Sequence, residues 1–436
     1  MKIVLENIRS FVGRHEIPLT PLTLLTGENS SGKTTFLASI AVITGQSGMP
    51  FSPRVNDAPF NLGNYDTVVT KINRRPSASS FTIGLNEDSP FQNIKKFYSA
   101  KYQSVSGKID LSEFRIRHDS DETSSGISIV KDIDLYSANL IHQGEEIFLG
   151  LISKNESLDL GFHQLSFKLF SLFTGSEVND LKDKTEDLTS IISNLTYYSS
   201  NIKVISNMFD QLPGGMNTLA LSPVRTHPRR TYDRITQEFT PDGAHIPYIL
   251  TEVLENPTYK SRLIEFGRAS KLYSTLSVKQ LGKSMSDPSQ VMVSDSKNVS
   301  NLVDVGYGVS QALPVVIESI MAPQNTRLLI QQPEVHLHPR AQAALGSLFV
   351  DLVANDKKEF VVETHSDYII DRVRMEVAQG KIDSKDVSIL YFEKNGFETT
   401  VHQLTLNECG EIQNAPPSYR EFFLEEMVDL LSRTEL

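Results

Sequence analysis

The 436-residue sequence predicts an α/β fold with a mixed or parallel sheet, an antiparallel β subdomain and an inserted helical lobe. From about residue 291, strand-like and helix-like segments alternate, which indicates a parallel sheet covered on both faces. Residues 67–160 contain short alternating segments broken by Ser, Gly and Asp, as in antiparallel sheets. Residues 161–216 change to helical spacing. We therefore expect a discontinuous head, residues 1–66 and 217–436, that encloses the other two parts.

The first strands and helix follow from apolar spacing. Residues 1–8 alternate apolar and polar side chains as a strand does, before a turn around Gly13. An apolar strand at residues 22–25 leads into a glycine-rich loop and a helix that begins near Gly32. Residues 48–66 are rich in Pro, Asn and Gly and predict a loop.

The second half of the head begins with a predicted strand at residues 217–225, followed by helices over 244–282 with one proline break. The later elements are expected to be strands at 292–296 and 302–306, a helix from Ser310, a strand at 327–330, a helix from Pro339, a strand at 360–366, a helix around 371–379, strands at 387–394 and 400–406, and a short last helix at 418–433.

Composition indicates a soluble globular protein, with 39% hydrophobic and 22% charged residues. The net charge of −11 argues against a surface that is basic all over, so DNA binding is not indicated. The densest basic cluster is formed by Arg225, His227, Arg229 and Arg230, which we interpret as a solvated loop or a phosphate-sensing patch.

The sequence also bears on the cell compartment. The single Cys409 excludes an internal disulfide and a cysteine-built zinc site. No apolar run approaches the roughly 20 residues that span a bilayer, and the first residues lack the apolar core of a signal peptide. We expect a cytoplasmic protein without a membrane partner.

A phosphate-binding loop is the clearest motif. Eight residues match G-x-x-x-x-G-K-[ST] between an apolar strand and a helix-compatible run: Gly27, Glu28, Asn29, Ser30, Ser31, Gly32, Lys33 and Thr34, with Thr35 following. Glycines let successive N–H groups converge on phosphate oxygens, and the helix adds its positive end. We expect Lys33 to reach the β and γ phosphates of ATP and the Thr34 hydroxyl to bind Mg²⁺.

Hydrolysis also needs a metal-holding acid and a residue that orients or deprotonates water. The candidate segment is LLIQQPEVHLHP at 328–339, an apolar strand that ends in polar residues where ligands bind to parallel sheets. In it, Gln331 occupies the expected metal position, Gln332 lies beside it, and Glu334 is the nearest carboxylate and the candidate base.

Together with LVDVGYGVSQALPVV before it and FVVETHSDYIIDRV after it, this segment closely resembles ABC-type P-loop ATPases of the OLD and RecF/SMC-like group. It looks most like short bacterial members with a QPE-x-HLHP motif and a THS switch. The resemblance covers residues 1–45, 217–250 and 300–425, including LSPVRTHPRR and FTPDGAHIPYIL, whereas residues 70–215 carry little of it.

The resemblance implies a head that dimerises around two ATP molecules. A signature motif would contact the partner's nucleotide, and its residues would be Gly306, Gly308, Ser310 and Gln311. His336 and His338 would lie in a loop that crosses the dimer interface, and His365 would sense the γ-phosphate. Residues 62–66 would couple the site to the middle lobe in place of a Q-loop. Without the family, His336, His338 and His365 could also be read as a zinc trio.

The sequence departs from the group at Gln331, where an acid is usual, and Gln332 is also an amide. An amide can hydrogen-bond a water but cannot accept its proton or offset the charge of a metal. Either the protein is a naturally slow, ATP-gated clamp, or a Glu→Gln change was introduced to trap ATP. On this basis Gln331→Glu is expected to raise turnover.

We also expect the Toprim nuclease of OLD proteins to be absent. The preferred hypothesis is therefore an ATPase that forms a homodimer or a higher even-numbered assembly and controls a separately encoded effector, such as a nuclease, in anti-phage defence. A RecF-like repair ATPase that clamps DNA and a nucleotide-gated scaffold with negligible turnover are the alternatives.

Overall fold

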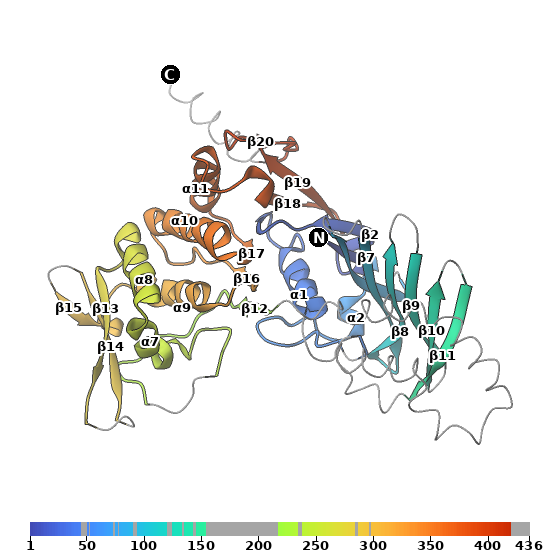
Figure 1. Cartoon of the computed structure of the whole chain (residues 1–436), viewed down its shortest axis with the longest axis horizontal. Helices are drawn as coiled ribbons and strands as arrows, with labels where there is room; N and C mark the ends of the chain where they lie inside the picture. Colours follow the sequence, from blue (N-terminus) through green and yellow to red (C-terminus); the bar gives the residue numbers. More distant parts are fainter. Residues whose placement is uncertain are drawn as a thin grey trace. The chain divides into compact units, whose positions relative to one another are not determined.

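The computed structural model describes residues 1–44, 50–51, 53–72, 75–76, 78–89, 94–119, 124–132, 135–142, 145–153, 217–233, 238–283, 287–295 and 298–419. The chain divides into two compact units (Figure 1). The first comprises Met1–Pro18 and Ala38–Asn217, and the second comprises Leu19–Leu37 and Thr218–Leu436. The expected helical insertion at 161–216 lies outside the described residues, as does nearly all of the expected last helix.

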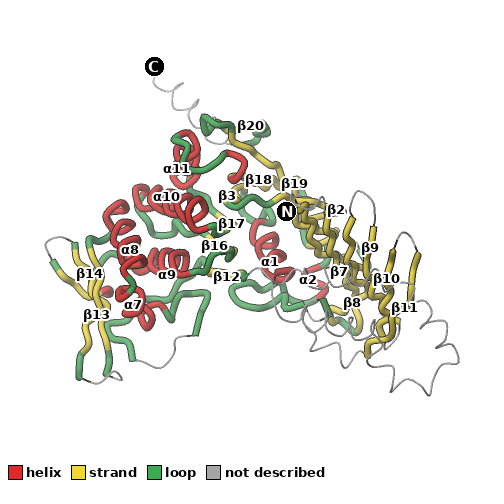
Figure 2. The backbone as a smooth tube through the Cα atoms, viewed as in Figure 1, coloured by secondary structure: helices red, strands yellow, loops and turns green. Residues whose placement is uncertain are grey.

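An eight-stranded antiparallel sheet dominates the first unit (Figure 2). Its order is β11-β10-β9-β8-β7-β6-β1-β2. The strands are β1 (Lys2–Ile8), β2 (Phe11–Pro18), β6 (Ser80–Ser89), β7 (Ile94–Val105), β8 (Lys108–Asp119), β9 (Ser124–Asp132), β10 (Leu135–His142) and β11 (Glu145–Ser153). The expected antiparallel sheet is thus present, but β1 and β2 extend it, because β1 pairs with β6 from Lys2↔Asn86 to Glu6↔Thr82.

The predicted loop at 48–66 ends in a short helix of the first unit, α2 (Tyr65–Val68), which Asn64 caps by accepting the Thr67 N–H. Tyr65 is buried and its ring centroid lies 5.9 Å from that of Phe81 on β6. Two short strands follow, β4 (Lys71–Ile72) and β5 (Arg75–Pro76). The turn expected at Gly13 lies earlier, between β1 and β2, and Gly13 itself is in β2 with φ +70°.

The second unit is built on a seven-stranded sheet in the order β12-β16-β17-β3-β18-β19-β20. Its strands are β12 (Thr218–Leu221), β16 (Arg327–Gln331), β17 (Glu359–Glu363), β3 (Leu22–Gly27), β18 (Val387–Asn395), β19 (Glu398–Leu406) and β20 (Ile412–Gln413). The strands from β12 to β18 pair in parallel, while β18, β19 and β20 pair antiparallel. The sheet is therefore mixed.

The helices of this unit connect the parallel strands: α1 (Lys33–Thr44, whose later part belongs to the first unit), α7 (Ile246–Glu255), α8 (Pro257–Ser270), α9 (Tyr307–Met321), α10 (Pro339–Asp356) and α11 (Asp367–Ala378). Figure 1 shows α8, α9 and α10 grouped beside β16 and β17. The sequence predicted α10 from Pro339 correctly, since His338 and Pro339 form its N-terminus.

Three predictions for this unit were wrong. The helical stretch expected to reach residue 282 ends at Ser270, where Lys271 adopts a left-handed conformation with φ 58°. A small antiparallel sheet follows: β13 (Thr275–Gln280), β14 (Ser289–Ser294) and β15 (Val299–Asn301). The strand expected at 302–306 is instead the 3₁₀ turn η3 (Leu302–Asp304), and α9 begins at Tyr307 rather than at Ser310.

The parallel strands send alternate residues to opposite faces of the sheet. Leu328 and Ile330 of β16 lie on one face, in an apolar cluster with side chains of α7, α8, α9 and α10. On the other face Phe392 of β18 packs against Phe36 of α1, with ring centroids 5.7 Å apart. Gln331 shares the alternation of Leu329 and therefore lies on the α1 face.

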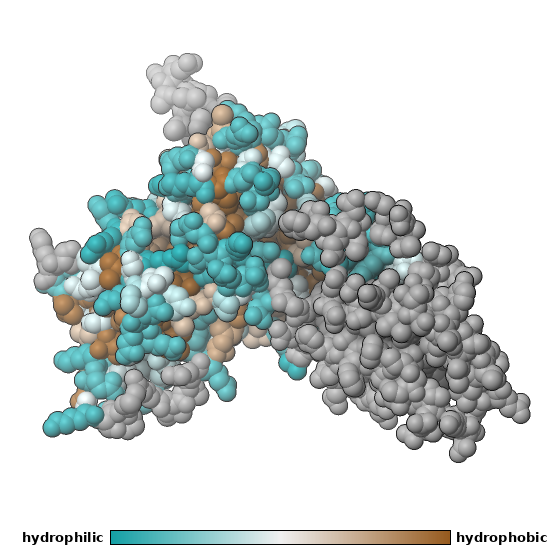
Figure 3. All heavy atoms as spheres, viewed as in Figure 1, coloured by the Kyte–Doolittle hydropathy of each residue, from teal (hydrophilic) through white to brown (hydrophobic). Residues whose placement is uncertain are grey.

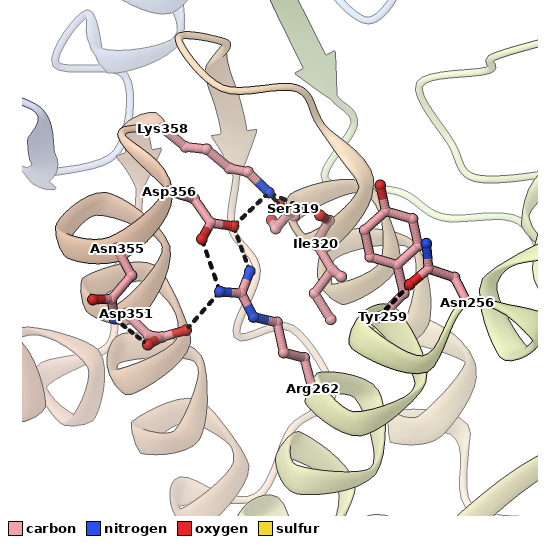
Figure 4. A network of polar contacts seen from close by, with 9 residues as sticks. All are labelled: Asn256, Tyr259, Arg262, Ser319, Ile320, Asp351, Asn355, Asp356 and Lys358. Atoms are coloured by element: carbon pink, nitrogen blue, oxygen red, sulfur yellow. Dashed lines mark hydrogen bonds and ion pairs between the residues drawn. The ribbon is translucent and has the colours of Figure 1, made fainter.

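A polar network joins α8, α9 and α10 (Figure 4). Arg262 of α8 donates to both carboxylate oxygens of Asp356 at the end of α10. Lys358 lies 3.4 Å from the same carboxylate and donates to the carbonyl oxygens of Ser319 and Ile320 in the last turn of α9, both at 2.8 Å. Lys358 directly precedes β17, so it ties the end of α9 to the start of that strand.

The surface of the described residues is mixed. Figure 3 shows hydrophilic side chains interspersed with smaller apolar areas on the visible face. None of the described helices is long and apolar enough to cross a bilayer.

Replacing Lys358 by Met should lower the free energy of unfolding by roughly 2–4 kcal/mol, because two buried carbonyls lose their donor and Asp356 loses one of its two basic partners. The side chain of Lys358 is only 2% exposed. Lys385→Met, at an exposed ion pair with Asp383, is the matched control and should leave the free energy of unfolding nearly unchanged. Urea denaturation followed by circular dichroism measures both, and equal losses would contradict the role given to Lys358.

Candidate nucleotide-binding site

The carboxyl ends of three adjacent strands, β3, β17 and β16, form one edge of the parallel sheet. Register places Gln331 of β16 opposite Glu363 of β17, and Glu363 opposite Leu25 of β3. Two residues after Leu25 the phosphate loop begins at Gly27. Side chains at equal register on parallel strands point to the same face. Gln331 and Glu363 therefore lie beside each other, on the face from which α1 starts.

The phosphate loop has the backbone that its glycines permit. Gly27 has φ +132° and Gly32 has φ +101°, and Ser30 between them is left-handed at φ 60°. A Cβ on Gly27 would lie 2.2 Å from the carbonyl oxygen of Phe392, so only glycine fits beside β18. Helix α1 follows at once, with the Phe36 N–H donating to the Gly32 carbonyl at 2.9 Å. The predicted strand–loop–helix arrangement is confirmed.

Lys33 lies inside this loop. Its ammonium group donates to the carbonyl oxygens of Gly27 at 2.9 Å and Glu28 at 2.6 Å. Burial lowers the pKa of Lys33, while the charges of Glu363 and Glu28 oppose that shift. The Thr399 hydroxyl of β19 donates to the Ser31 carbonyl at 2.8 Å and braces the loop. The ammonium group is thus held within the curve of the loop, where phosphates are bound in this motif.

Thr34 and Gln331 were the two residues predicted to bind the metal. Both contact Glu363, which was not among the predicted site residues. The Thr34 hydroxyl lies 3.2 and 3.0 Å from the two carboxylate oxygens of Glu363, to which it donates. The Gln331 amide lies 3.5 Å from the same carboxylate. Glu363 is the first residue of the ETHS segment. Its position at a strand end, next to the motif that contains His365, is the signal from which it could have been predicted.

The turn after β16 rests on a buried arginine. Arg225 donates to the carbonyl oxygen of Gln331 at 3.1 Å and approaches that of Gln332 at 3.4 Å. Burial lowers the pKa of Arg225 to about 10, with an opposing contribution from Glu334. Gln332 is left-handed, with φ 43°, and its N–H donates to the Glu363 carbonyl at 2.7 Å. Arg225 therefore fixes the path of the chain that carries Gln331, Gln332 and Glu334.

The basic residues that lie close together in the sequence are dispersed in the structure. Arg225 is 2% exposed, which rules out a solvated loop at that position. His227 lies 3.0 Å from the Tyr307 hydroxyl, and Arg230 pairs with Asp304. Arg225, His227 and Arg230 thus each have a different partner.

Glu334 connects the turn after β16 to the switch segment. One of its carboxylate oxygens accepts the His365 N–H at 2.6 Å, and burial raises its pKa. The imidazole of His365 is exposed, and partial burial together with the charge of Lys33 lowers its pKa. Ser366 caps α11 by accepting the Ile369 N–H at 3.2 Å. His365 therefore lies within electrostatic range of Lys33 in the phosphate loop.

The start of α9, where the predicted signature residues lie, contacts the loop that carries His336. Gly306 is the N-cap of α9, and a Cβ added to it would meet nothing within 4 Å. A Cβ on Gly308 would lie 3.0 Å from the His336 carbonyl oxygen, and the Tyr307 and His336 rings are 5.0 Å apart. The Ser310 hydroxyl donates to the Tyr307 carbonyl at 2.8 Å. The start of α9 and the His336 loop thus form one local surface.

The remaining predicted residues are placed as follows. His338 is the N-cap of α10 and accepts the Arg340 N–H through its side chain. Gln311 is buried in α9, and its amide nitrogen has no hydrogen-bond partner among the described residues. In the part of the chain that the structure describes, no group of three or more His, Cys, Asp and Glu is arranged to hold a metal ion, which includes the proposed zinc trio.

The site fits Mg²⁺ bound together with a nucleotide. Thr34 offers a hydroxyl, Glu363 a carboxylate and Gln331 an amide oxygen that is buried without a hydrogen-bond partner in the described structure. Oxygen donors of this kind, completed by phosphates and water, are those that Mg²⁺ prefers. When bound, the ion would neutralise part of the charge of the phosphates.

Comparison with known proteins gives one family and several similar structures. The family model described as AAA ATPase domain matches residues 1–370. A crystal structure of the SmcHead bound to the C-winged helix domain of ScpA is 12% identical, with a TM-score of 0.45 over 93% of this chain and 98% of that one. The SMC head domain from Thermotoga maritima is 10% identical, with a TM-score of 0.39 over 92% and 97%. No curated protein matches the chain.

Gly27→Ala should weaken nucleotide binding at least about tenfold, because the new methyl group would displace the loop from the Phe392 carbonyl. Gly396→Ala is the matched control: its φ of +66° is also positive, but nothing lies within 4 Å of the added Cβ. Fluorescence titration with a fluorescent ATP analogue compares the two variants. Equal affinity of Gly27→Ala and the wild type would contradict this account of the loop.

Proposed function

The chain belongs to the AAA ATPase domain family, and we propose that it binds Mg²⁺–ATP, dimerises around it and controls a separately encoded effector. The observation that carries the proposal is the meeting of Lys33, Thr34 and Glu363 at the carboxyl edge of three parallel strands. A cation, a hydroxyl and a carboxylate are thereby set at the start of a helix, where phosphate and its metal bind.

A nucleotide site formed jointly by two subunits explains the glycines at the start of α9. Open space around Gly306 leaves the first N–H groups of that helix accessible to an anion. Since Gly308 packs on the His336 loop, the two motifs would meet a partner together. We assign Gly306, Gly308, Ser310 and Gln311 to the nucleotide held by the other subunit, and His336 and His338 to the interface.

Slow hydrolysis is the expected chemistry. Gln332 has no proton-accepting group, and Glu334 has one carboxylate oxygen occupied by the His365 N–H. Its raised pKa suits a base, and its second oxygen is buried without a partner in the described structure. Glu334 is therefore our candidate base, Gln332 orients water, and His365 senses the γ-phosphate beside Lys33.

Control of an effector in anti-phage defence extends the resemblance to OLD-type ATPases. Co-purification from the native operon with ATP, followed by mass measurement, tests it: a nuclease or Toprim protein retained only with ATP supports the proposal. Retention on duplex DNA that weakens steeply with salt would instead favour the RecF-like alternative. A homodimer with neither partner would favour the nucleotide-gated scaffold.

Gly306→Asp should abolish ATP-dependent dimers while leaving ATP binding by the single subunit intact. Aspartate is a favourable N-cap, and the site has room for it, but its charge repels a phosphate presented by the partner. Light scattering with and without ATP measures the assembly, and Gly396→Asp, at an open turn, is the control.

Mixing Gly306→Asp with Lys33→Ala should restore dimers, because one of the two composite sites would then have both an intact loop and an intact signature. Neither variant should form them alone. Full ATP-dependent dimerisation of Gly306→Asp by itself would refute the signature assignment.

A further inference from the structure

The sequence motifs do not explain why the Glu363 carboxylate is buried. It is only 5% exposed, yet no ion pair among the described residues includes it. A carboxylate removed from water is costly unless charge or hydrogen bonds compensate it. Its hydrogen bonds come from a neutral hydroxyl and, at long range, from a neutral amide. The fold keeps this carboxylate next to Thr34, where the charge of Lys33 acts on it without a direct ion pair.

At this edge of the sheet the amide lies on β16 and the carboxylate on β17. An acid was expected at Gln331, at the end of β16, and the sequence has an amide there. The register partner of Gln331 on β17 is Glu363, and both side chains lie on the α1 face. The edge of the sheet therefore still carries one carboxylate, displaced by one strand. Its contact with Thr34 is the contact that a metal-holding acid needs.

We propose that Glu363, and not a residue of β16, is the carboxylate that holds Mg²⁺ at this site, with the amide oxygen of Gln331 as its neutral neighbour. This inference rests on the proposed binding of ATP. It implies that Gln331 is an intrinsic part of the site, since a second acid at position 331 would lie against Glu363. Two carboxylates at that distance would repel each other.

The expectation that Gln331→Glu raises turnover is revised accordingly. The informative change is the exchange of the two residues, Glu363→Gln with Gln331→Glu, which moves the carboxylate to β16 and keeps the net charge. Glu363→Gln alone is nearly isosteric, and its amide oxygen can still accept from Thr34. Loss of the metal can thus be separated from loss of the fold.

The experiment measures the affinity for mant-ATPγS with excess Mg²⁺ and with EDTA, by fluorescence titration. In the wild type, Mg²⁺ should tighten binding. In Glu363→Gln that gain should shrink roughly 10- to 100-fold, while the affinity in EDTA is retained. The exchange variant should recover most of the gain. Glu408→Gln, at an exposed turn residue, is the charge-matched control and should behave as wild type.

Two results for Glu363→Gln would overturn the proposal. A full Mg²⁺ gain in Glu363→Gln overturns the assignment of the metal to Glu363. Equal loss of affinity in Mg²⁺ and in EDTA overturns it too, because the residue would then only brace the loop. Failure of the wild type to bind mant-ATPγS under both conditions refutes the proposed function itself. Free Mn²⁺, followed by electron paramagnetic resonance in the presence of the analogue, gives an independent count of bound metal.

Discussion

Parallel hydrogen bonding between β16, β17 and β3 is the constraint on which the site depends. It sets Gln331 level with Glu363, and Glu363 level with Leu25, two residues before the phosphate loop. The position of every polar group at that edge follows from this register, because a slip of one residue would turn Glu363 into the apolar cluster on the other face. The sheet thus fixes the positions of these groups, and the loops at its edge carry the other polar groups of the site.

Local signals predicted the parts of the site that are contiguous in sequence. The spacing of Gly27, Gly32 and Lys33 fixes a strand, a turn and a helix within a few residues, and His338 with Pro339 marks the start of α10. The boundaries of helices and strands were predicted less accurately where the same residues suit two kinds of secondary structure. Residues 302–306 are apolar enough for a strand, but Asn301 caps a 3₁₀ turn there, and α9 begins three residues before the expected Ser310.

Long-range pairing accounts for the remaining differences. The sequence places β1 near the phosphate loop, yet β1 pairs on one side with β2 and on the other with β6, about 80 residues later. Periodicity gives the faces of a strand but not its neighbours. For the same reason Glu363 was overlooked: its value comes from lying beside Gln331 and Thr34, and neither neighbour is close to it in sequence.

The contacts of Lys358 make a mechanical unit of two elements that carry different motifs. Helix α9 has the signature glycines at its first turn and is held by Lys358 at its last, while β17 begins at the next residue and ends at Glu363. Lys358 therefore links the helix that begins at the two glycines to the strand that positions Glu363. In the proposed dimer, a subunit docked on the glycine end of α9 would be connected to the carboxylate edge of the sheet through these contacts.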